Sequence, residues 1–145
     1  MDLGDRICSY FEPFDNKLPP RTNVILRIDG KAFHTYTRGI KRPFCEDFMN
    51  HMDLTAIEVL KQVQGAKCAY VQSDEINVLY TTYDTKQTQP WLNNRINKVI
   101  SHSASIATSH FNNFRSDYGK IAQFDSRAGS FNLPIEVNNY FIWRQ

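Results

Sequence analysis

The chain has 145 residues and a formal net charge of +2, from 17 Lys and Arg against 15 Asp and Glu. Its length fits one domain with a buried core, and a hydrophobic fraction of 41% excludes global disorder, collagen and coiled coil. The near balance of charge excludes nucleic-acid binding by bulk positive charge, so any such contact must come from locally placed Arg and Lys.

The cysteines and the apolar runs indicate in which cellular compartment the protein is expected. Cys8, Cys45 and Cys68 are odd in number and lack CxxC spacing, which predicts reduced, mostly buried thiols rather than a disulfide framework or a zinc site. No apolar run approaches membrane-spanning length, and the N-terminus lacks the basic start and apolar stretch of a secretory signal. We therefore expect a cytoplasmic protein without membrane contacts.

The first half of the chain predicts a helix, a strand and a second helix. A short helix is expected from Asp2 to about Phe11, before a proline-containing loop. Residues 23–29, NVILRID, have the apolar, branched character of a buried strand, which ends at Gly30. Residues 46–64 fit an amphipathic helix with Gly65 as its cap. The apolar positions of this helix are Met49, Met52, Ala56, Leu60 and Val63.

The second half predicts a hairpin, a helix, a strand and a last helix. Residues 67–72 and 75–82 read as strands around Ser73 and Asp74. Residues 91–114 have helical periodicity, residues 121–124 read as a short strand, and Pro134 opens the final helix. The expected inward positions of the long helix are Ile96, Val99, Ile100, Ser103, Ala107 and Phe111.

The order β-α-β-β-α-β predicts an α+β domain of the ferredoxin-like type, with an antiparallel sheet and helices on one face. The crossover makes the first two strands parallel, and the third strand lies between them in this topology. Asp29 ends the first strand and Asp74 sits in the hairpin after the second. We therefore expect these two carboxylates to meet at one edge of the sheet.

Two carboxylates with Glu75 beside them suit a hard divalent cation such as Mg²⁺, which also accepts phosphate oxygens. Gly30 would let a phosphate or metal approach the backbone closely. The same fold with two such Asp residues is the palm of many polymerases and cyclases, where two metal ions clamp a phosphoryl transfer. From the pattern alone, an ordinary Asp-Gly turn stays open as an alternative.

Basic residues follow the first strand. Lys31, and Arg38, Lys41 and Arg42 in the next loop, are expected at the same edge, where they could hold phosphates or form a solvated loop. Arg95 and Lys98 lie three apart on one face of the long helix, as a phosphate site or as a solvated face. Phe33 is expected in the core, and His34 could stack on a nucleotide or cap the loop.

Several motifs in chain order resemble the tRNA(His) guanylyltransferase family. RIDGKAFHTYTRGIKRPF at 27–44 resembles its RxDGRxFHxF…KP segment, and YVQSDEINVLY at 70–80 resembles its QSDE segment. NNRINKVISHSASIATSHF at 93–111 is similar to its RxxK helix, and residues 122–145 to its FDxR…P…YxxWRQ segment. The opening LGDRICSYFE at 3–12 resembles the guanylyltransferase-like branch that repairs tRNA 5′ ends.

The resemblance implies an Mg²⁺-dependent nucleotidyltransferase that adds GTP or another nucleotide to the 5′ end of tRNA. A 5′-monophosphate is activated with ATP unless a triphosphate is present, and the 3′-hydroxyl of the incoming nucleotide then attacks. Asp29 and Asp74 would hold two metal ions with help from the Gly30 backbone, and Glu75 would assist as a third catalytic group. The implied nucleotide-binding residues are Asp29, Gly30, Lys31, Ala32, Phe33, His34, Lys41, Arg42, Ser73, Asp74, Arg95 and Lys98.

Asp125 and Arg127 are expected to support the architecture, with Arg127 able to touch phosphate. Lys31 replaces the family's commoner Arg, which keeps the charge but loses the planar fork. The family continues past WRQ, so we expect residues 1–145 to form a single palm domain without that later segment, and the family's assemblies imply a homodimer or tetramer. Two other functions stay open: a non-catalytic nucleotide- or tRNA-binding palm, and a cyclase-like enzyme.

Overall fold

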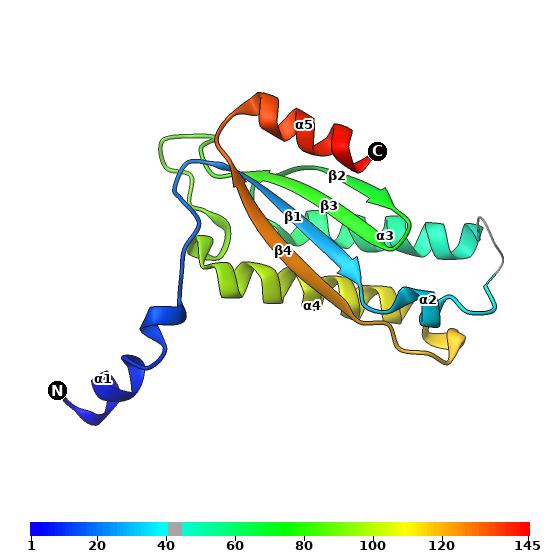
Figure 1. Ribbon diagram of the computed structural model, residues 1–145, viewed down its shortest axis with the longest axis horizontal. Helices are drawn as coiled ribbons and strands as arrows, with labels where there is room; N and C mark the ends of the chain where they lie inside the picture. Colours follow the sequence, from blue (N-terminus) through cyan, green and yellow to red (C-terminus); the bar gives the residue numbers. More distant parts are fainter. Residues whose placement is uncertain (41–44) are drawn as a thin grey trace.

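A computed structural model describes residues 1–40 and 45–145; Lys41 and Arg42, two expected phosphate ligands, lie outside the described residues. A four-stranded antiparallel sheet in the order β2-β3-β1-β4 forms the centre of the molecule (Figure 1). Its strands are β1 (Asn23–Gly30), β2 (Ala66–Gln72), β3 (Glu75–Thr81) and β4 (Phe124–Phe131). This order, with β3 between β1 and β2, confirms the ferredoxin-like α+β prediction.

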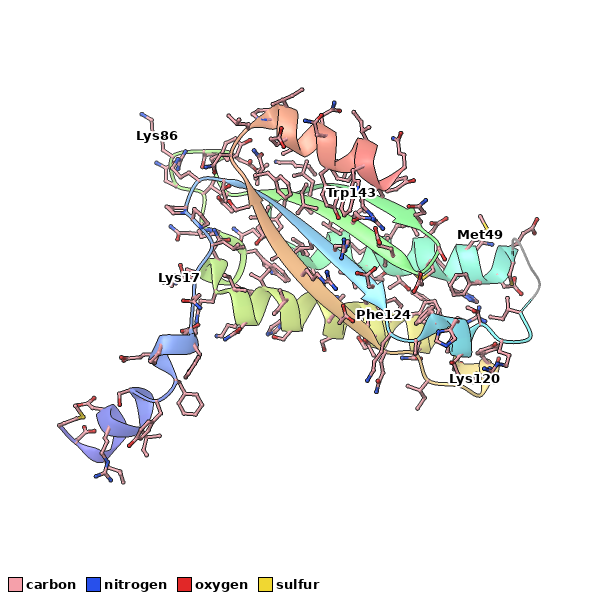
Figure 2. The ribbon with its side chains drawn as sticks, in the orientation of Figure 1. Lys17, Met49, Lys86, Lys120, Phe124 and Trp143 are labelled. Atoms are coloured by element: carbon pink, nitrogen blue, oxygen red, sulfur yellow. The ribbon has the colours of Figure 1, made fainter. Side chains whose placement is uncertain are left out.

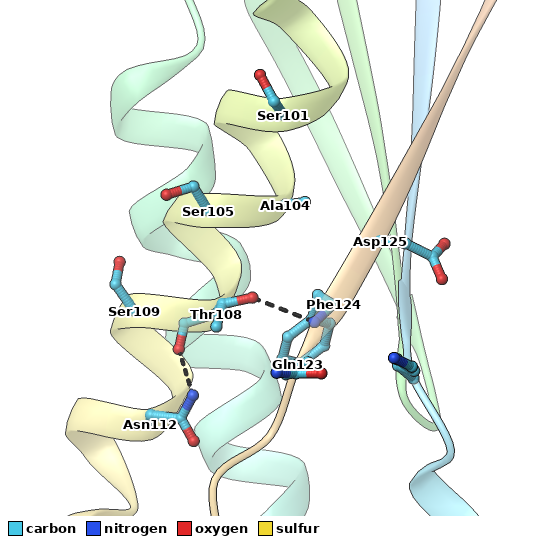
Figure 3. A pocket seen from close by; sticks show the side chains of 10 residues that line it. Ser101, Ala104, Ser105, Thr108, Ser109, Asn112, Gln123, Phe124 and Asp125 are labelled. Carbon is cyan, nitrogen blue, oxygen red and sulfur yellow. Dashed lines mark hydrogen bonds between the residues drawn. The ribbon is translucent and has the colours of Figure 1, made fainter. Parts of the chain in front are cut away.

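Two long helices, α3 (Glu46–Gln62) and α4 (Ile96–Phe114), cover one face of the sheet. The side chain of Asn112 ties α4 to the segment before β4, because it bonds both the N–H and the C=O of Ala122 at 2.8 Å. One turn earlier, Thr108 accepts a 3.1 Å bond from the Phe124 backbone N–H (Figure 3). The shorter helical segments are α1 (Leu3–Cys8), η1 (Glu12–Phe14), α2 (Phe33–Tyr36), η2 (Trp91–Asn94), η3 (Ser116–Tyr118) and α5 (Pro134–Arg144).

The core lies between the sheet and these two helices. Alternate residues of a strand face opposite sides, and those on the helix side of β1 and β3 are completely buried: Val24, Leu26, Ile28, Ile76, Val78 and Tyr80. Phe33, predicted to be core, is buried in an aromatic cluster below the end of β1, as expected. The other rings of this cluster are Tyr36, Phe48, Phe111 and Phe124. The aromatic cluster supports the short α2 segment that follows Gly30.

The final strand and the long helix differ from their predicted bounds. β4 begins at Phe124, where the predicted strand of 121–124 ended. Its sequence FDSRAGSF lacks an apolar run, and it is a strand because it pairs with β1 along its whole length. The helix predicted from residue 91 begins at Ile96, because three consecutive left-handed residues, Leu92, Asn93 and Asn94, interrupt it.

Three smaller predictions were wrong in part. α3 ends at Gln62, so Gly65 is not its cap; it has a φ of +82° in the following turn, packed against the Thr81 carbonyl. Met49 points outward and Phe48 takes its place in the core. The three cysteines are free, as predicted, but Cys8 and Cys68 are exposed and Cys45 is only partly buried.

The two ends of the chain lie apart from the helical layer. α5 crosses the face of the sheet opposite to α3 and α4, so the prediction that helices cover one face holds for the two crossover helices only. The N-terminal arm, residues 1–15, extends away from the body and joins it near Lys17 (Figure 2). No helix in the described part of the chain is long and apolar enough to cross a membrane.

Candidate active site

The side of the sheet away from α3 and α4 carries a polar row at the end of β1. Asp29 pairs in register with Glu75 on β3 and with Asp125 on β4. Two residues back, Arg27 pairs with Asn77 and Arg127 in the same way. Directly opposed residues share one face of an antiparallel sheet, so three carboxylates and two guanidinium groups face the same side.

Asp74 lies beside Asp29, as the topology predicted. The hairpin between β2 and β3 has only two loop residues, Ser73 and Asp74, and Ser73 adopts a left-handed φ of 54°. The backbone N–H of Gly30 donates to the carbonyl oxygen of Asp74 at 3.0 Å. This bond fixes the hairpin turn against the end of β1, and it brings the backbones of the two predicted metal-binding segments into contact.

Both of these aspartates are half-buried and have raised pKa values. Burial and the neighbouring Glu75 carboxylate raise the pKa of Asp29, although Arg27, whose Nε donates to Oδ2 at 3.2 Å, opposes the change. Burial raises the pKa of Asp74, although a hydrogen bond from Ser73 opposes it. Partial burial therefore penalises the ionised form of both carboxylates, and a bound cation would remove that penalty.

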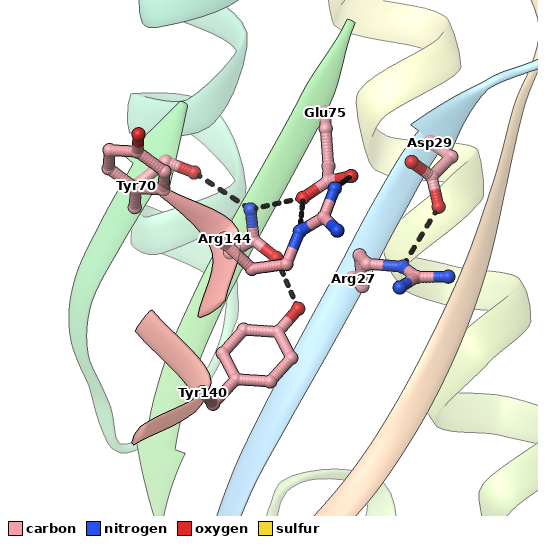
Figure 4. Close-up of polar contacts among 7 residues, drawn as sticks. Arg27, Asp29, Tyr70, Glu75, Tyr140 and Arg144 are labelled. Atoms are coloured by element: carbon pink, nitrogen blue, oxygen red, sulfur yellow. Dashed lines mark hydrogen bonds and ion pairs between the residues drawn. The ribbon is translucent and has the colours of Figure 1, made fainter. Parts of the chain in front are cut away.

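Glu75 is buried and its charge is compensated (Figure 4). Arg144 at the end of α5 donates Nε to Oε1 at 2.8 Å and its second nitrogen to Oε2, while the Asn77 amide donates to Oε1 at 2.8 Å. Burial alone would raise the pKa of Glu75, but these bonds outweigh it and lower the pKa. The predicted third catalytic carboxylate is thus held ionised beside Asp29.

Tyr140 of α5 completes this network. Its hydroxyl donates to the side-chain oxygen of Asn77, and burial raises the pKa of Tyr140 to about 12, so the group remains a donor at neutral pH. Arg144, Tyr140 and Asn77 together connect α5 to β3. The side chain of Glu75 therefore has partners from a helix almost 70 residues further along the chain.

The segment after β1 presents the other predicted nucleotide ligands. A Cβ on Gly30 would lie 2.4 Å from the Phe33 ring, so only glycine fits against this aromatic residue. Lys31 and His34 are exposed, and Ala32 begins α2 with a left-handed φ of 51°. Any contact of Phe33 with a nucleotide must use its backbone, because its ring belongs to the core.

Arg95 and Lys98 are not brought to this edge. Arg95 lies directly before α4 and Lys98 lies in its first turn. The helix approaches Phe124, at the start of β4, only at Thr108, about three turns further along. Arg95 makes two hydrogen bonds to Asp15, at 3.0 Å and 2.6 Å, and its strand-like backbone pairs with Lys17. These residues line a separate cavity between the N-terminal arm and α4. Their predicted phosphate role thus belongs to a different region from Asp29 and Asp74.

Arg27, Asp125 and Arg144 were not predicted as site residues, although the structure places them, together with Arg127, around Asp29 and Glu75. Strand alternation contained a signal for Arg27, because a charged residue two positions before Asp29 must share its face. Asp125 and Arg127 were expected to support the architecture, with Arg127 able to touch phosphate, and the misplaced strand hid their alignment with β1. The contact of Arg144 with Glu75 had no local signal.

The donor set fits magnesium that is shared with a substrate. In residues 1–40 and 45–145, no three His, Cys, Asp or Glu side chains are grouped to hold a metal ion by themselves. Mg²⁺ is usually held by one or two carboxylates, with water and substrate phosphates as further ligands. Asp29 and Asp74 provide two such carboxylates at one edge of the sheet, and the predicted help from the Gly30 backbone stays a prediction, because Gly30 is required here by the Phe33 ring that packs against it.

Known proteins have sequences related to this chain. The family described as tRNAHis guanylyltransferase matches residues 5–132. The tRNA(His) guanylyltransferase of Schizosaccharomyces pombe is 29% identical over 90% of this chain and 51% of its own length. That of Kluyveromyces lactis is 30% identical over 92% of this chain and 59% of its own length. The chain thus spans little more than half the length of these relatives.

Solved structures agree with this relationship. A bacterial tRNA(His) guanylyltransferase (Thg1)-like protein in complex with GTP is 45% identical, with a TM-score of 0.95 over 99% of this chain and 64% of its own. The complex of such a protein with ATP is 44% identical, with a TM-score of 0.96. The Saccharomyces cerevisiae enzyme, at 23% identity and a TM-score of 0.79, shares the fold. From the family match over 5–132 and these likenesses, the chain belongs to the tRNAHis guanylyltransferase family.

Proposed function

We propose that this chain is the palm of an Mg²⁺-dependent nucleotidyltransferase that joins a nucleotide, GTP or another, to the 5′ end of a tRNA. The observation that carries the proposal is the contact between the Gly30 N–H and the Asp74 carbonyl, which brings two half-buried aspartates to one edge of the sheet. Family membership and the GTP and ATP complexes of bacterial Thg1-like proteins support this chemistry.

In this reaction, the 3′-hydroxyl oxygen of the incoming nucleotide forms a bond to the 5′ phosphorus of the RNA. The bond from that phosphorus to its leaving group breaks, releasing pyrophosphate from a 5′-triphosphate or AMP from an ATP-activated end. Two metal ions, when bound, would neutralise charge on the attacking and leaving oxygens. Asp29 and Asp74 would hold the ions, and Ser73, Lys31 and the Gly30 backbone would position the triphosphate.

Glu75 has a different role in this proposal. Its oxygens are already occupied by Arg144 and Asn77, so it supplies fixed negative charge beside Asp29 rather than a free base. Arg95 and Lys98 would meet RNA or a second triphosphate only at the far end of the sheet, where they lie beside Asp15.

Label transfer tests the proposal directly. The protein is incubated with Mg²⁺, α-labelled GTP and a 5′-truncated tRNA, beside Asp29→Asn and Asp74→Asn variants. Each substitution keeps the side-chain size and removes the charge that would hold the metal, so we expect transfer to fall by at least about 100-fold. Asp53→Asn is the matched control, because Asp53 is exposed on α3, away from the site, and should leave transfer unchanged.

Three results would count against the proposal. Transfer that survives Asp74→Asn would contradict the metal assignment. GTP binding without any transfer by the unaltered protein would instead favour a nucleotide-binding palm that does not catalyse. Conversion of GTP into a cyclic product without RNA would favour a cyclase. Repeating the assay with 5′-monophosphate and 5′-triphosphate ends tests the tRNA and ATP assignments. Sedimentation of the protein tests the expected dimer or tetramer.

A further inference from the structure

A basic cavity lies beside the α2 segment. It has a volume of about 560 Å³, and its wall includes Lys31, Thr35, Arg38, Lys120 and Ile121. Three of these side chains are cationic, and none of the described residues that line the cavity is Asp or Glu. A cavity of this size and charge accommodates roughly one nucleotide unit with its phosphate. We call it the basic pocket.

Lys120 is held in place at the basic pocket. Its ammonium group lies 3.3–3.5 Å from the carbonyl oxygens of Thr35, Tyr36 and Arg38, and 5.6 Å from the centre of the Tyr118 ring. These contacts fix the position of a charge that would otherwise move on a long side chain. A fixed cation loses less conformational freedom when it meets an anion than a mobile surface lysine does.

The basic pocket also has an apolar part. Ile121 is 82% exposed, directly after Lys120 and opposite the α2 segment. Exposing an apolar side chain to water is unfavourable, and the sugar or base of a bound nucleotide could cover this one. A combination of cations and an apolar surface is therefore better suited to a nucleotide of a polymer than to an inorganic anion.

The location of the basic pocket relates it to the candidate active site. Lys31 is two residues from Asp29, and its backbone N–H donates at 2.8 Å to the carbonyl of Gln123, in the segment that includes Ile121. The same lysine lines a second cavity, of about 490 Å³, that extends along α4 to Asp125. Lys31 thus stands between the carboxylate edge and the basic pocket.

We propose that the basic pocket binds the phosphate backbone of the RNA acceptor strand next to the reacting 5′ end. The inference rests on the proposed function and deepens it by assigning Arg38, Lys120 and Ile121 to the RNA substrate. A phosphate could also come from a free nucleoside triphosphate. The RNA assignment is favoured by position. Lys31 lies between the two aspartates and the pocket, so the pocket has space for the next nucleotide of an RNA strand whose 5′ end reaches the aspartates.

Binding measurements separate the two sources of phosphate. The affinity for 5′-truncated tRNA is measured by fluorescence anisotropy over a range of salt concentrations, and the affinity for Mg²⁺–GTP by calorimetry, for Arg38→Gln and Lys120→Gln. Each lost phosphate contact should reduce the slope of log affinity against log salt by about 0.7–0.9, with GTP affinity unchanged. Ile121→Ser should weaken RNA binding without changing the slope.

Lys86→Gln is the matched control, because Lys86 is exposed at the opposite end of the molecule (Figure 2). Arg38→Gln removes a cation without removing the bonds that Lys120 makes to α2, so it separates RNA binding from a folding defect. Equal salt slopes for Arg38→Gln, Lys120→Gln and Lys86→Gln would overturn the inference, as would a loss of GTP affinity with RNA affinity intact. Failure of the unaltered protein to bind RNA would also overturn it. Failure of label transfer with RNA binding intact would count against the proposed function alone.

Discussion

The two faces of the sheet use the same strands for different purposes. On the face under α3 and α4, residues such as Leu26 and Val78 are completely buried. On the other face, at the positions adjacent to these two residues in β1 and β3, Arg27 and Asn77 bind other polar groups. The apolar face loses its contacts with water entirely, whereas the polar face must satisfy each charge. We therefore expect the free energy of unfolding to depend mainly on the apolar face and the proposed catalysis on the polar face.

The largest effect is expected when a ring of α4 is removed from the core that covers the apolar face. Phe111 is completely buried in the aromatic cluster, so Phe111→Ala should lower the free energy of unfolding by about 3–5 kcal/mol through lost burial and a new cavity. Phe14, 71% exposed on the N-terminal arm, is the control, and Phe14→Ala should change stability by less than about 0.5 kcal/mol. Urea unfolding measures both, and similar losses would contradict the separation of the faces.

A smaller loss is expected on the polar face. Arg144→Gln leaves the buried Glu75 carboxylate without its ion pair, which should cost about 1–3 kcal/mol, since Arg144 itself is partly exposed. Arg144→Lys should recover part of this loss, because it restores the charge but not both hydrogen bonds. Arg6→Gln on exposed α1 serves as control. A stability equal to that of the unaltered protein would show that α5 does not hold Glu75 in solution.

The next largest loss of stability is expected from removing a single hydrogen bond, the one that the Tyr140 hydroxyl donates. Tyr140→Phe keeps the ring packed against Phe131 but removes the hydroxyl that donates to Asn77. We expect a loss of about 0.5–1.5 kcal/mol in thermal or chemical unfolding. Tyr10→Phe, at an exposed position on the N-terminal arm, should have no effect. A neutral result for both variants would mean that water replaces the Tyr140 hydroxyl without cost.

The smallest effect concerns a pair away from both faces. Hydrogen bonds from Arg95 lower the pKa of Asp15 below its ordinary value of 3.8, so the pair stabilises the fold fully above that pH and loses this contribution as the pH falls through the lower, folded-state value. Asp15→Asn should therefore lower the melting temperature slightly at pH 7, and the difference should vanish in strong acid. Asp53→Asn is the control. A difference that persists in acid would show that packing, not charge, is involved.

Local sequence patterns predicted the secondary structure correctly where the residues of a segment themselves favour that structure. The apolar run at 23–29 and the hairpin around Ser73 were predicted closely, and the crossover rule then placed Asp29 beside Asp74. β4 was misplaced because its residues are mostly small or polar, and it depends on β1 for its pairing. Arg144 reaches Glu75 across 69 positions, and no local pattern records such a contact.

The basic residues at the start of α4 were also placed by long-range contacts rather than by local pattern. A spacing of three placed Arg95 and Lys98 on one helix face, but spacing cannot tell which end of the helix lies near the carboxylates. The left-handed residues Leu92–Asn94 shift the start of α4, and Asp15 of the distant arm then binds Arg95. Local periodicity thus predicts a face, and the position along the sheet follows only from the tertiary contacts.

The two-residue hairpin at Ser73 and Asp74 has a consequence for how tightly a cation could be bound. A ligand-bearing loop of many residues must lose conformational entropy when it closes on an ion. Here the loop is as short as a hairpin allows, and a backbone bond to Gly30 restrains it further. The backbone segments that carry the two aspartates are therefore already in place before an ion binds. Release of water from the ion and ordering of the nucleotide, rather than ordering of the protein, should then dominate the entropy of binding.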